Sequence, residues 1–141
     1  MSSERLFLDA AFIQALLNPR DDYHAQARNL FPRVREAVEI WLTEAILIEV
    51  GNALSTFNRS GAVQFIEQCY TTANIRLVTV DTALLQNALA LYRACPDKGW
   101  GLTDCISFVV MEQQSLRLAL TSDQHFVQAG FIVLMRTDNS Y

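Results

Sequence analysis

The stretch Ile75-Arg-Leu-Val-Thr-Val80 decides the fold class, because it has the composition of a β-strand and lies between two helical patterns. It is rich in β-branched residues, which favour strands. Residues 62–73 before it repeat apolar side chains at helical spacing. Asp81 after it is placed to cap a helix that continues to Arg93. A strand between two helices is the repeating unit of an α/β protein with a parallel sheet.

The same alternation extends from this stretch toward both ends of the chain. Further strands are predicted at residues 5–9, 38–42, 116–120 and 131–135. Further helices are predicted at residues 10–17, 22–36, 44–58, 103–114 and 124–129. We therefore predict a single domain over residues 1–141. Its fold class is α/β, with three α/β/α layers around a central, mostly parallel sheet of four to five strands.

The composition fits a single folded domain. Hydrophobic residues make up 51% of the 141 residues and charged residues 18%, which excludes a disordered tail or a fibrous repeat. Cys69, Cys95 and Cys105 have no paired spacing, so we expect buried, reduced thiols. Neither a signal-peptide pattern nor an apolar run long enough to cross a bilayer is present, and we expect a cytoplasmic protein without membrane contact.

Four carboxylates occupy positions where such a fold gathers its ligands. Asp9 ends the first predicted strand, Asp123 follows a later strand, and Asp104 lies in the first turn of a helix. Glu49 shares a helix face with small residues and Asn52. Open parallel sheets bind ligands beyond the carboxyl ends of their strands. Each acid also has a structural explanation, since three can serve a helix N-terminus and Glu49 can simply face solvent.

The chemistry of four converging carboxylates indicates a metal site. Carboxylates that face one another retain protons unless a cation compensates their charge. No His or Cys belongs to this pattern, and oxygen ligands alone favour Mg²⁺ or Mn²⁺ over zinc. Such ions bind phosphate oxygens and activate water. The pattern therefore predicts hydrolysis of phosphodiester bonds.

Four segments give the chain a resemblance to a known family. They are Phe7-Leu-Asp9, Leu42-Thr-Glu-Ala-Ile-Leu-Ile-Glu-Val50, Trp100-Gly-Leu-Thr-Asp-Cys-Ile-Ser-Phe108, and Leu120-Thr-Ser-Asp-Gln-His-Phe126 followed by Gly130-Phe131. In these segments the chain resembles the PIN-domain ribonucleases, which include the VapC-type toxins of toxin–antitoxin pairs. The resemblance covers nearly the whole chain, and the segments around Asp104 and Asp123 are its most specific parts.

The resemblance implies a PIN-like fold and cleavage of RNA with Mg²⁺ or Mn²⁺. It implies that Asp9 and Asp104 are the principal metal ligands. Glu49 is implied to bind metal or orient the attacking water, and Asp123 to complete the acidic cluster. Thr121 is implied to form a hydrogen bond within the site.

The resemblance also implies partners. These are an RNA substrate, a cognate antitoxin of a type II pair, and a second copy of the chain in a homodimer. Apolar helix faces around Phe57, Phe65 and Tyr70 are candidates for the dimer contact, and core packing is the alternative explanation for them.

One departure from the family keeps a second hypothesis open. Ala10 and Ala11 follow Asp9 where the family often has Thr, Ser or Asn. A missing hydroxyl leaves Asn52 or Ser107 to supply the polar group. The alternative is therefore a PIN-like module that binds RNA or protein with weak or no catalysis. His125 lies near the predicted site and is a candidate for contacting RNA.

The charge balance is compatible with an RNA substrate. The formal net charge is −4, from 11 basic and 15 acidic residues. With the four candidate ligands set aside, the remaining acids equal the basic residues in number. The chain lacks the basic excess that gives tight nonspecific binding of nucleic acid. Affinity for RNA is therefore expected to depend on the metal and a few arginines.

Overall fold

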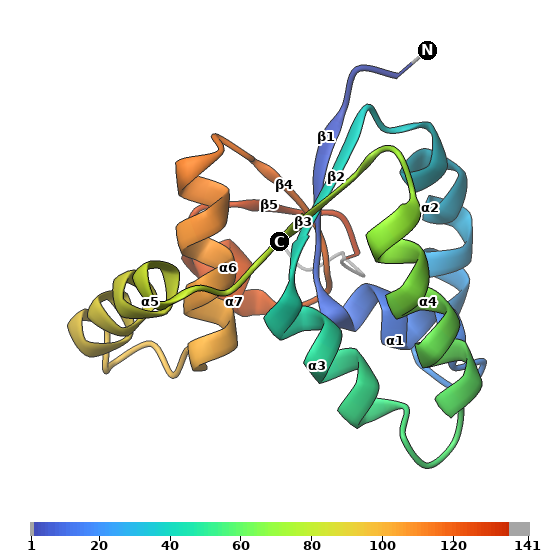
Figure 1. The fold of residues 1–141 in the computed structure, drawn as a ribbon, viewed down its shortest axis with the longest axis horizontal. Coiled ribbons are helices and arrows are strands. Elements are labelled where there is room, and N and C mark those ends of the chain that lie inside the picture. The colour runs from blue at the N-terminus through green and yellow to red at the C-terminus, as the bar shows by residue number, and fades with distance from the viewer. Residues whose placement is uncertain (1, 136–141) are drawn as a thin grey trace.

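The strands and helices alternate along the chain as the sequence predicted (Figure 1). The computed structural model describes residues 2–135. Its strands are β1 (Arg5–Leu8), β2 (Glu39–Thr43), β3 (Ile75–Val78), β4 (Leu118–Leu120) and β5 (Ile132–Val133). Its helices are α1 (Ala10–Leu17), α2 (His24–Glu36), α3 (Glu44–Ala53), α4 (Arg59–Thr71), α5 (Thr82–Ala94), α6 (Leu102–Gln113) and α7 (Gln124–Gln128). The predicted domain of residues 1–141 also includes residue 1 and residues 136–141, which lie outside the described residues, so its extent stays a prediction.

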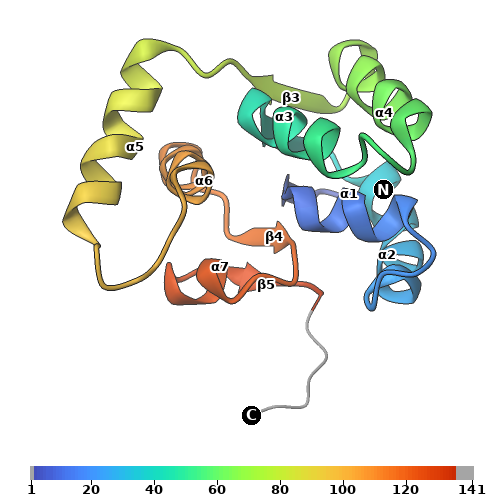
Figure 2. The same ribbon diagram turned by 90° about the horizontal axis from the view of Figure 1, so that it is seen from below.

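The five strands form one parallel sheet in the order β3-β2-β1-β4-β5. Parallel neighbours need crossover connections, and the helices supply them. Figures 1 and 2 show α1, α2 and α4 on one side of the sheet and α5 and α6 on the other. The predicted three-layer α/β/α architecture is therefore confirmed, with all five strands parallel.

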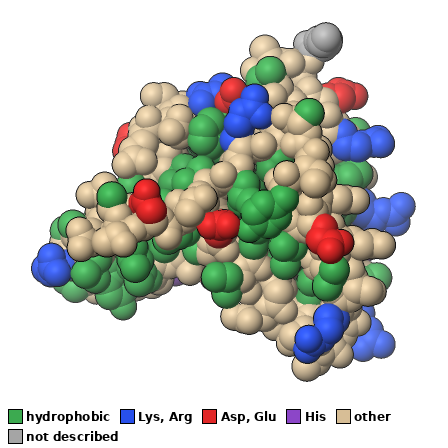
Figure 3. All heavy atoms as spheres, viewed as in Figure 1, with side chains coloured by type: hydrophobic (Ala, Val, Ile, Leu, Met, Phe, Trp, Pro, Cys, Tyr) green, Lys and Arg blue, Asp and Glu red, His purple; other side chains and the backbone are tan. Residues whose placement is uncertain are grey.

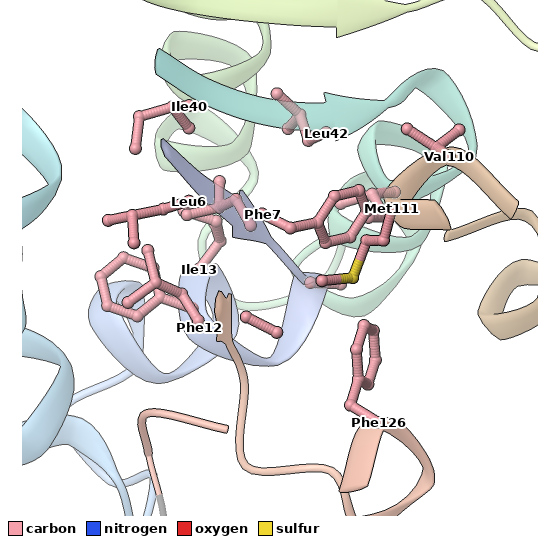
Figure 4. Packing of buried hydrophobic residues seen from close by; sticks show 14 of the residues in the cluster. Leu6, Phe7, Phe12, Ile13, Ile40, Leu42, Val110, Met111 and Phe126 are labelled. Atoms are coloured by element: carbon pink, nitrogen blue, oxygen red, sulfur yellow. The ribbon is translucent and has the colours of Figure 1, made fainter. Parts of the chain in front are cut away.

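The central strand is buried on both faces, as a parallel sheet covered by helices requires. Leu6 and Phe7 are both fully buried, although consecutive residues of a strand point to opposite faces. Figure 4 shows Leu6 on the side of Phe12, and Phe7 on the side of Met111 and Phe126. The two helical layers thus pack on opposite faces of the same short strand.

The predicted helix over residues 44–58 is wrong at its carboxyl end. Helix α3 ends at Ala53, and α4 begins at Arg59 because the Asn58 side chain caps it. Asn58 Oδ1 accepts the Gly61 N–H at 3.1 Å, and Asn58 Nδ2 donates to the Leu17 carbonyl at 3.2 Å. Phe57 therefore lies in the turn and is 52% exposed, whereas the helical pattern predicted it inside the helix on its apolar face.

Aromatic contacts join α6 and α7 near the carboxyl end of the sheet. The Phe108 ring lies edge-on to Phe126 with centroids 4.9 Å apart, and edge-on to Trp100 at 5.0 Å. The Trp100 indole N–H donates to Gln128 Oε1 at 3.0 Å. These contacts fix the loop that precedes α6 against the short helix α7.

The cysteines form no disulfide among the described residues. Cys69 and Cys105 are buried as predicted, and Cys95 is half-buried. Within residues 2–135, no helix is both long and apolar enough to cross a membrane.

We expect Phe126→Ala to lower the free energy of unfolding by about 3–5 kcal/mol, because it empties a fully buried aromatic site. Urea denaturation measures this loss. Phe57→Ala is the matched control, and its cost is expected to be about 1 kcal/mol or less because half of the ring is already exposed. Equal losses in the two variants would contradict the core packing described above.

A candidate metal centre at the carboxyl edge of the sheet

The four predicted carboxylates line one open cleft of about 470 Å³ at the carboxyl ends of the strands. Asp9 follows β1 directly, and Asp123 lies three residues after β4. Asp104 enters the cleft from the first turn of α6, and Glu49 from α3. The rest of the lining consists of small or neutral side chains: Ala10, Ala11, Gln14, Asn52 and Ala53.

Asp9 is held from the neighbouring strand rather than by its own helix. Its backbone N–H donates to the Leu120 carbonyl at 3.2 Å, which extends the pairing of β1 with β4 by one residue. The hydroxyl of Thr121 donates to Asp9 Oδ2 at 2.7 Å. Asp9 occupies the N-cap position of α1, but its side chain makes no capping hydrogen bond there.

Thr121 links two of the acids. Its side chain is fully buried, and Oγ1 accepts the Asp123 N–H at 3.1 Å while the hydroxyl proton goes to Asp9. Asp123 Oδ1 in turn accepts the His125 N–H at 2.9 Å and caps α7. For Asp123 both explanations therefore apply, since the same side chain caps a helix and lines the cleft.

His125 lies beside Asp104 and Asp123, although the predicted ligand pattern included no histidine. Its Nδ1 is 3.0 Å from Asp104 Oδ2 and 3.5 Å from Asp123 Oδ1. Asp104 Oδ2 also accepts the Gly101 N–H at 3.0 Å. The premise that only oxygen atoms face the site is therefore wrong. The available signal was the position of His125, two residues after a candidate ligand at the start of a helix.

The supporting residues divide into two groups. Asn52 lies one turn from Glu49 on α3 and lines the cleft with it, as the shared helix face predicted. Ser107 is fully buried, does not line the cleft, and its Oγ has no hydrogen-bond partner among the described residues. Ala11 and Gln14 line the cleft from α1. They lie three residues apart on the predicted helix and so share one of its faces, which was the signal that could have identified them.

The electrostatics of the cleft favour a cation. Burial raises the pKa of Asp9 from 3.8 to about 7 against the opposing effect of the Thr121 hydrogen bond, and the nearby charges of Glu49 and Asp104 raise it further. Partial burial and the charges of Asp104 and Asp123 also raise the pKa of Glu49. No Lys or Arg lies among the described residues that line the cleft. The donor set therefore fits a divalent cation, which supplies the positive charge that these side chains lack.

Solved structures share this fold. The VapC20 toxin of Mycobacterium tuberculosis, a sarcin–ricin loop cleaving toxin, superposes with a TM-score of 0.80 at 23% identity over 90% of this chain and 96% of that one. VapBC2 of Rickettsia felis, bound to a DNA fragment from its promoter, gives 0.62 at 13% identity over 92% and 97%. FitAcB of Neisseria gonorrhoeae gives 0.57 at 17% identity over 92% and 96%.

These likenesses confirm the predicted PIN-like fold and extend the resemblance to VapC-type toxins from sequence segments to three dimensions. No protein-family profile and no curated protein matches the chain.

We expect Asp9→Asn to stabilise the protein in the absence of divalent cations above pH 7. The pKa of Asp9 is higher in the folded chain than in the unfolded chain. Above pH 7 the carboxyl is ionised in the folded chain, and this lowers the free energy of unfolding. The loss disappears as the pH falls from 7 to 4, because the buried carboxyl then takes up its proton. At pH 8 the free energy of unfolding of Asp9→Asn is expected to exceed that of the wild type by about 4 kcal/mol. This follows from the shift of the Asp9 pKa from 3.8 to about 7 at about 1.36 kcal/mol per pKa unit.

The measurement is urea denaturation in EDTA at pH 4 and pH 8. Asp97→Asn, on an exposed loop carboxylate, is the control and should show no such pH dependence. If the free energies of unfolding of Asp9→Asn and the wild type differ by the same amount at both pH values, the raised pKa of Asp9 is contradicted.

Proposed function

We propose that the chain is a divalent-metal-dependent endoribonuclease, the toxin of a type II toxin–antitoxin pair. In this proposal Asp9, Glu49, Asp104 and Asp123 hold Mg²⁺ or Mn²⁺ and direct hydrolysis of RNA phosphodiester bonds. One observation carries the proposal, namely the convergence of the four carboxylates on one cleft of a PIN-like fold. The VapC20 toxin, which has this fold, cleaves the sarcin–ricin loop, and this supports a structured RNA as substrate.

Each residue has a role that follows from its contacts. Bound cations of this class polarise a phosphate oxygen and lower the pKa of a coordinated water. Asp9 and Asp104 are the principal ligands, because Thr121 and the Gly101 N–H hold their carboxylates in fixed orientations. Glu49 is partly open to solvent, so it can orient the attacking water as a second ligand or as a base.

Asp123 completes the cluster, and Asn52 beside Glu49 offers an amide to the substrate. Asn52 thus takes the place of the hydroxyl that is absent at Ala10 and Ala11. Ser107, buried away from the cleft lining, takes no part in this scheme.

The surface has features that suit the proposed partners. Arg side chains gather along the edge of the molecule over α2 (Figure 3), and they can contact RNA phosphates. Hydrophobic side chains reach the surface over α5 and between α3 and α4 (Figure 3). Phe57 and Tyr70 are 52% and 59% exposed, whereas Phe65 is half-buried against the core. Exposed aromatic side chains support a contact with a second copy of the chain or with the antitoxin.

The cytoplasm, where RNA is available, is the proposed location.

Cleavage of a structured RNA is the direct test of the nuclease. We expect the wild type with Mg²⁺ or Mn²⁺ to cleave an end-labelled RNA that contains a sarcin–ricin loop. EDTA, or the double variant Asp9→Asn with Asp104→Asn, should lower the rate by about 100-fold or more. Asp97→Asn, on an exposed loop carboxylate, is the matched control and should cleave at the wild-type rate.

Cleavage that persists in EDTA and in the double variant would overturn the metal mechanism. RNA binding without metal-dependent cleavage would instead support the second candidate, a PIN-like binding module. The specific observation that favours that candidate is the alanine pair of the cleft lining, Ala10 and Ala11, which offers no hydroxyl beside Asp9.

Toxicity is a separate expectation. We expect induced expression of the wild type in bacterial cells to arrest growth, and Asp104→Asn to relieve the arrest at equal protein level. Co-expression of the product of the adjacent gene should restore growth if that product is the antitoxin. Normal growth with the soluble wild-type protein present would count against the toxin assignment.

A further inference from the structure

His125 places an imidazole nitrogen beside the carboxylates of Asp104 and Asp123, two of the acids that line the cleft. One ligand atom from each of Asp104, Asp123 and His125 lies within 4.8 Å of the other two. The distances from Nδ1 to the two carboxylates are 3.0 Å and 3.5 Å. This side chain lies outside the oxygen-only set on which the proposed function rests.

The spacing of these atoms matches neighbouring ligands of a single ion. Two adjacent ligands of an octahedral cation with bonds of about 2.1 Å are about 3.0 Å apart. The separations of His125 Nδ1 from Asp104 Oδ2 and Asp123 Oδ1 are already close to this value. Without an ion, the contact of His125 Nδ1 with Asp104 Oδ2 is a hydrogen bond. When an ion binds between the carboxylates it takes the place of that proton, and the ring then carries its proton on Nε2 and offers the Nδ1 lone pair to the ion.

The imidazole is positioned by contacts independent of any ion. The His125 N–H is bound to Asp123 Oδ1, and the next residue, Phe126, is fully buried against Phe7 and Phe108. Gln128, at the other end of α7, accepts the Trp100 indole N–H. Both ends of this five-residue helix are therefore fixed, which holds the backbone that carries the ring beside Asp104 and Asp123.

We propose that His125 Nδ1 is a direct ligand of the divalent cation held by Asp104 and Asp123, and that it makes the site select first-row transition ions such as Mn²⁺ over Mg²⁺. The inference rests on the proposed function for the presence of a divalent cation and adds the nitrogen ligand and the selectivity. Imidazole nitrogen suits transition ions, whereas Mg²⁺ prefers oxygen ligands and water. Among the first-row divalent ions, Mn²⁺ gains the least affinity from a nitrogen ligand. The later ions are therefore expected to be preferred over Mg²⁺ at least as strongly as Mn²⁺ is.

Pulsed electron paramagnetic resonance of the tag-free protein loaded with Mn²⁺ tests the bond directly. We expect ¹⁴N modulation from a coordinated imidazole in the wild type. Labelling the histidines with ¹⁵N should replace it by the ¹⁵N pattern. The chain has two histidines, and His24→Gln should keep the signal because His24 Nδ1 contacts the Ala15 carbonyl instead. Absence of histidine nitrogen coupling in the wild type would overturn the proposal without any substitution.

Competition between the two ions tests the selectivity. We expect His125→Ala to weaken Mn²⁺ binding, measured by calorimetry, by about tenfold or more, with a smaller effect on Mg²⁺. His24→Gln should leave both affinities unchanged. Equal losses for Mn²⁺ and Mg²⁺ in His125→Ala, or no loss for either, would refute the selectivity.

The two proposals fail separately. Nitrogen coupling to Mn²⁺ together with no RNA cleavage would leave the ligand assignment intact and refute the nuclease. Metal-dependent cleavage by a protein whose Mn²⁺ shows no histidine coupling would leave the nuclease intact and refute the ligand.

Discussion

The candidate site depends on the parallel pairing of β1 with β4, which joins residues 112 positions apart in the chain. Leu8 pairs with Leu120, and the next hydrogen bond joins the Asp9 N–H to the Leu120 carbonyl. This register brings Thr121 beside Asp9, and Thr121 then orients Asp123. A shift of one residue would turn Thr121 to the opposite face of the sheet, because side chains alternate along a strand. The register is therefore the constraint on which the geometry of the acids depends.

The positions of Asp9, Asp104 and Asp123 at strand or helix ends could be read from the sequence, because strand composition and helix signals are local. The capping of α5 by Asp81 is an example, with Oδ1 accepting the Leu84 N–H at 2.9 Å. The orientation of His125 could not be read, because the packing of α6 against α7 determines it. The end of α3 was also missed. Its apolar periodicity continues to Phe57, but Asn58 bonds to the distant Leu17 carbonyl and caps the next helix instead.

The acidic cleft works against the stability of the fold. The raised pKa of Asp9 means that ionising this buried carboxyl costs free energy that the unfolded chain does not lose. The partly exposed pair of Arg5 and Glu39 offsets little of this cost, since ion pairs near the surface contribute only weakly. Burial of the sheet and of the aromatic side chains beneath the cleft must supply the rest. Any cation that binds only the folded chain therefore adds to stability as well.

The order of the strands also sets when the cleft can assemble during synthesis. Thr121 follows Asp9 by 112 residues, and β4, the strand that pairs with β1 on this side, directly precedes Thr121. Domains fold as units during translation, and contacts this far apart form only after both segments are available. A nascent or prematurely terminated chain therefore carries the first carboxylate without its hydrogen-bond donor. The ribosome therefore adds 112 residues after Asp9 before the complete acidic cleft can form.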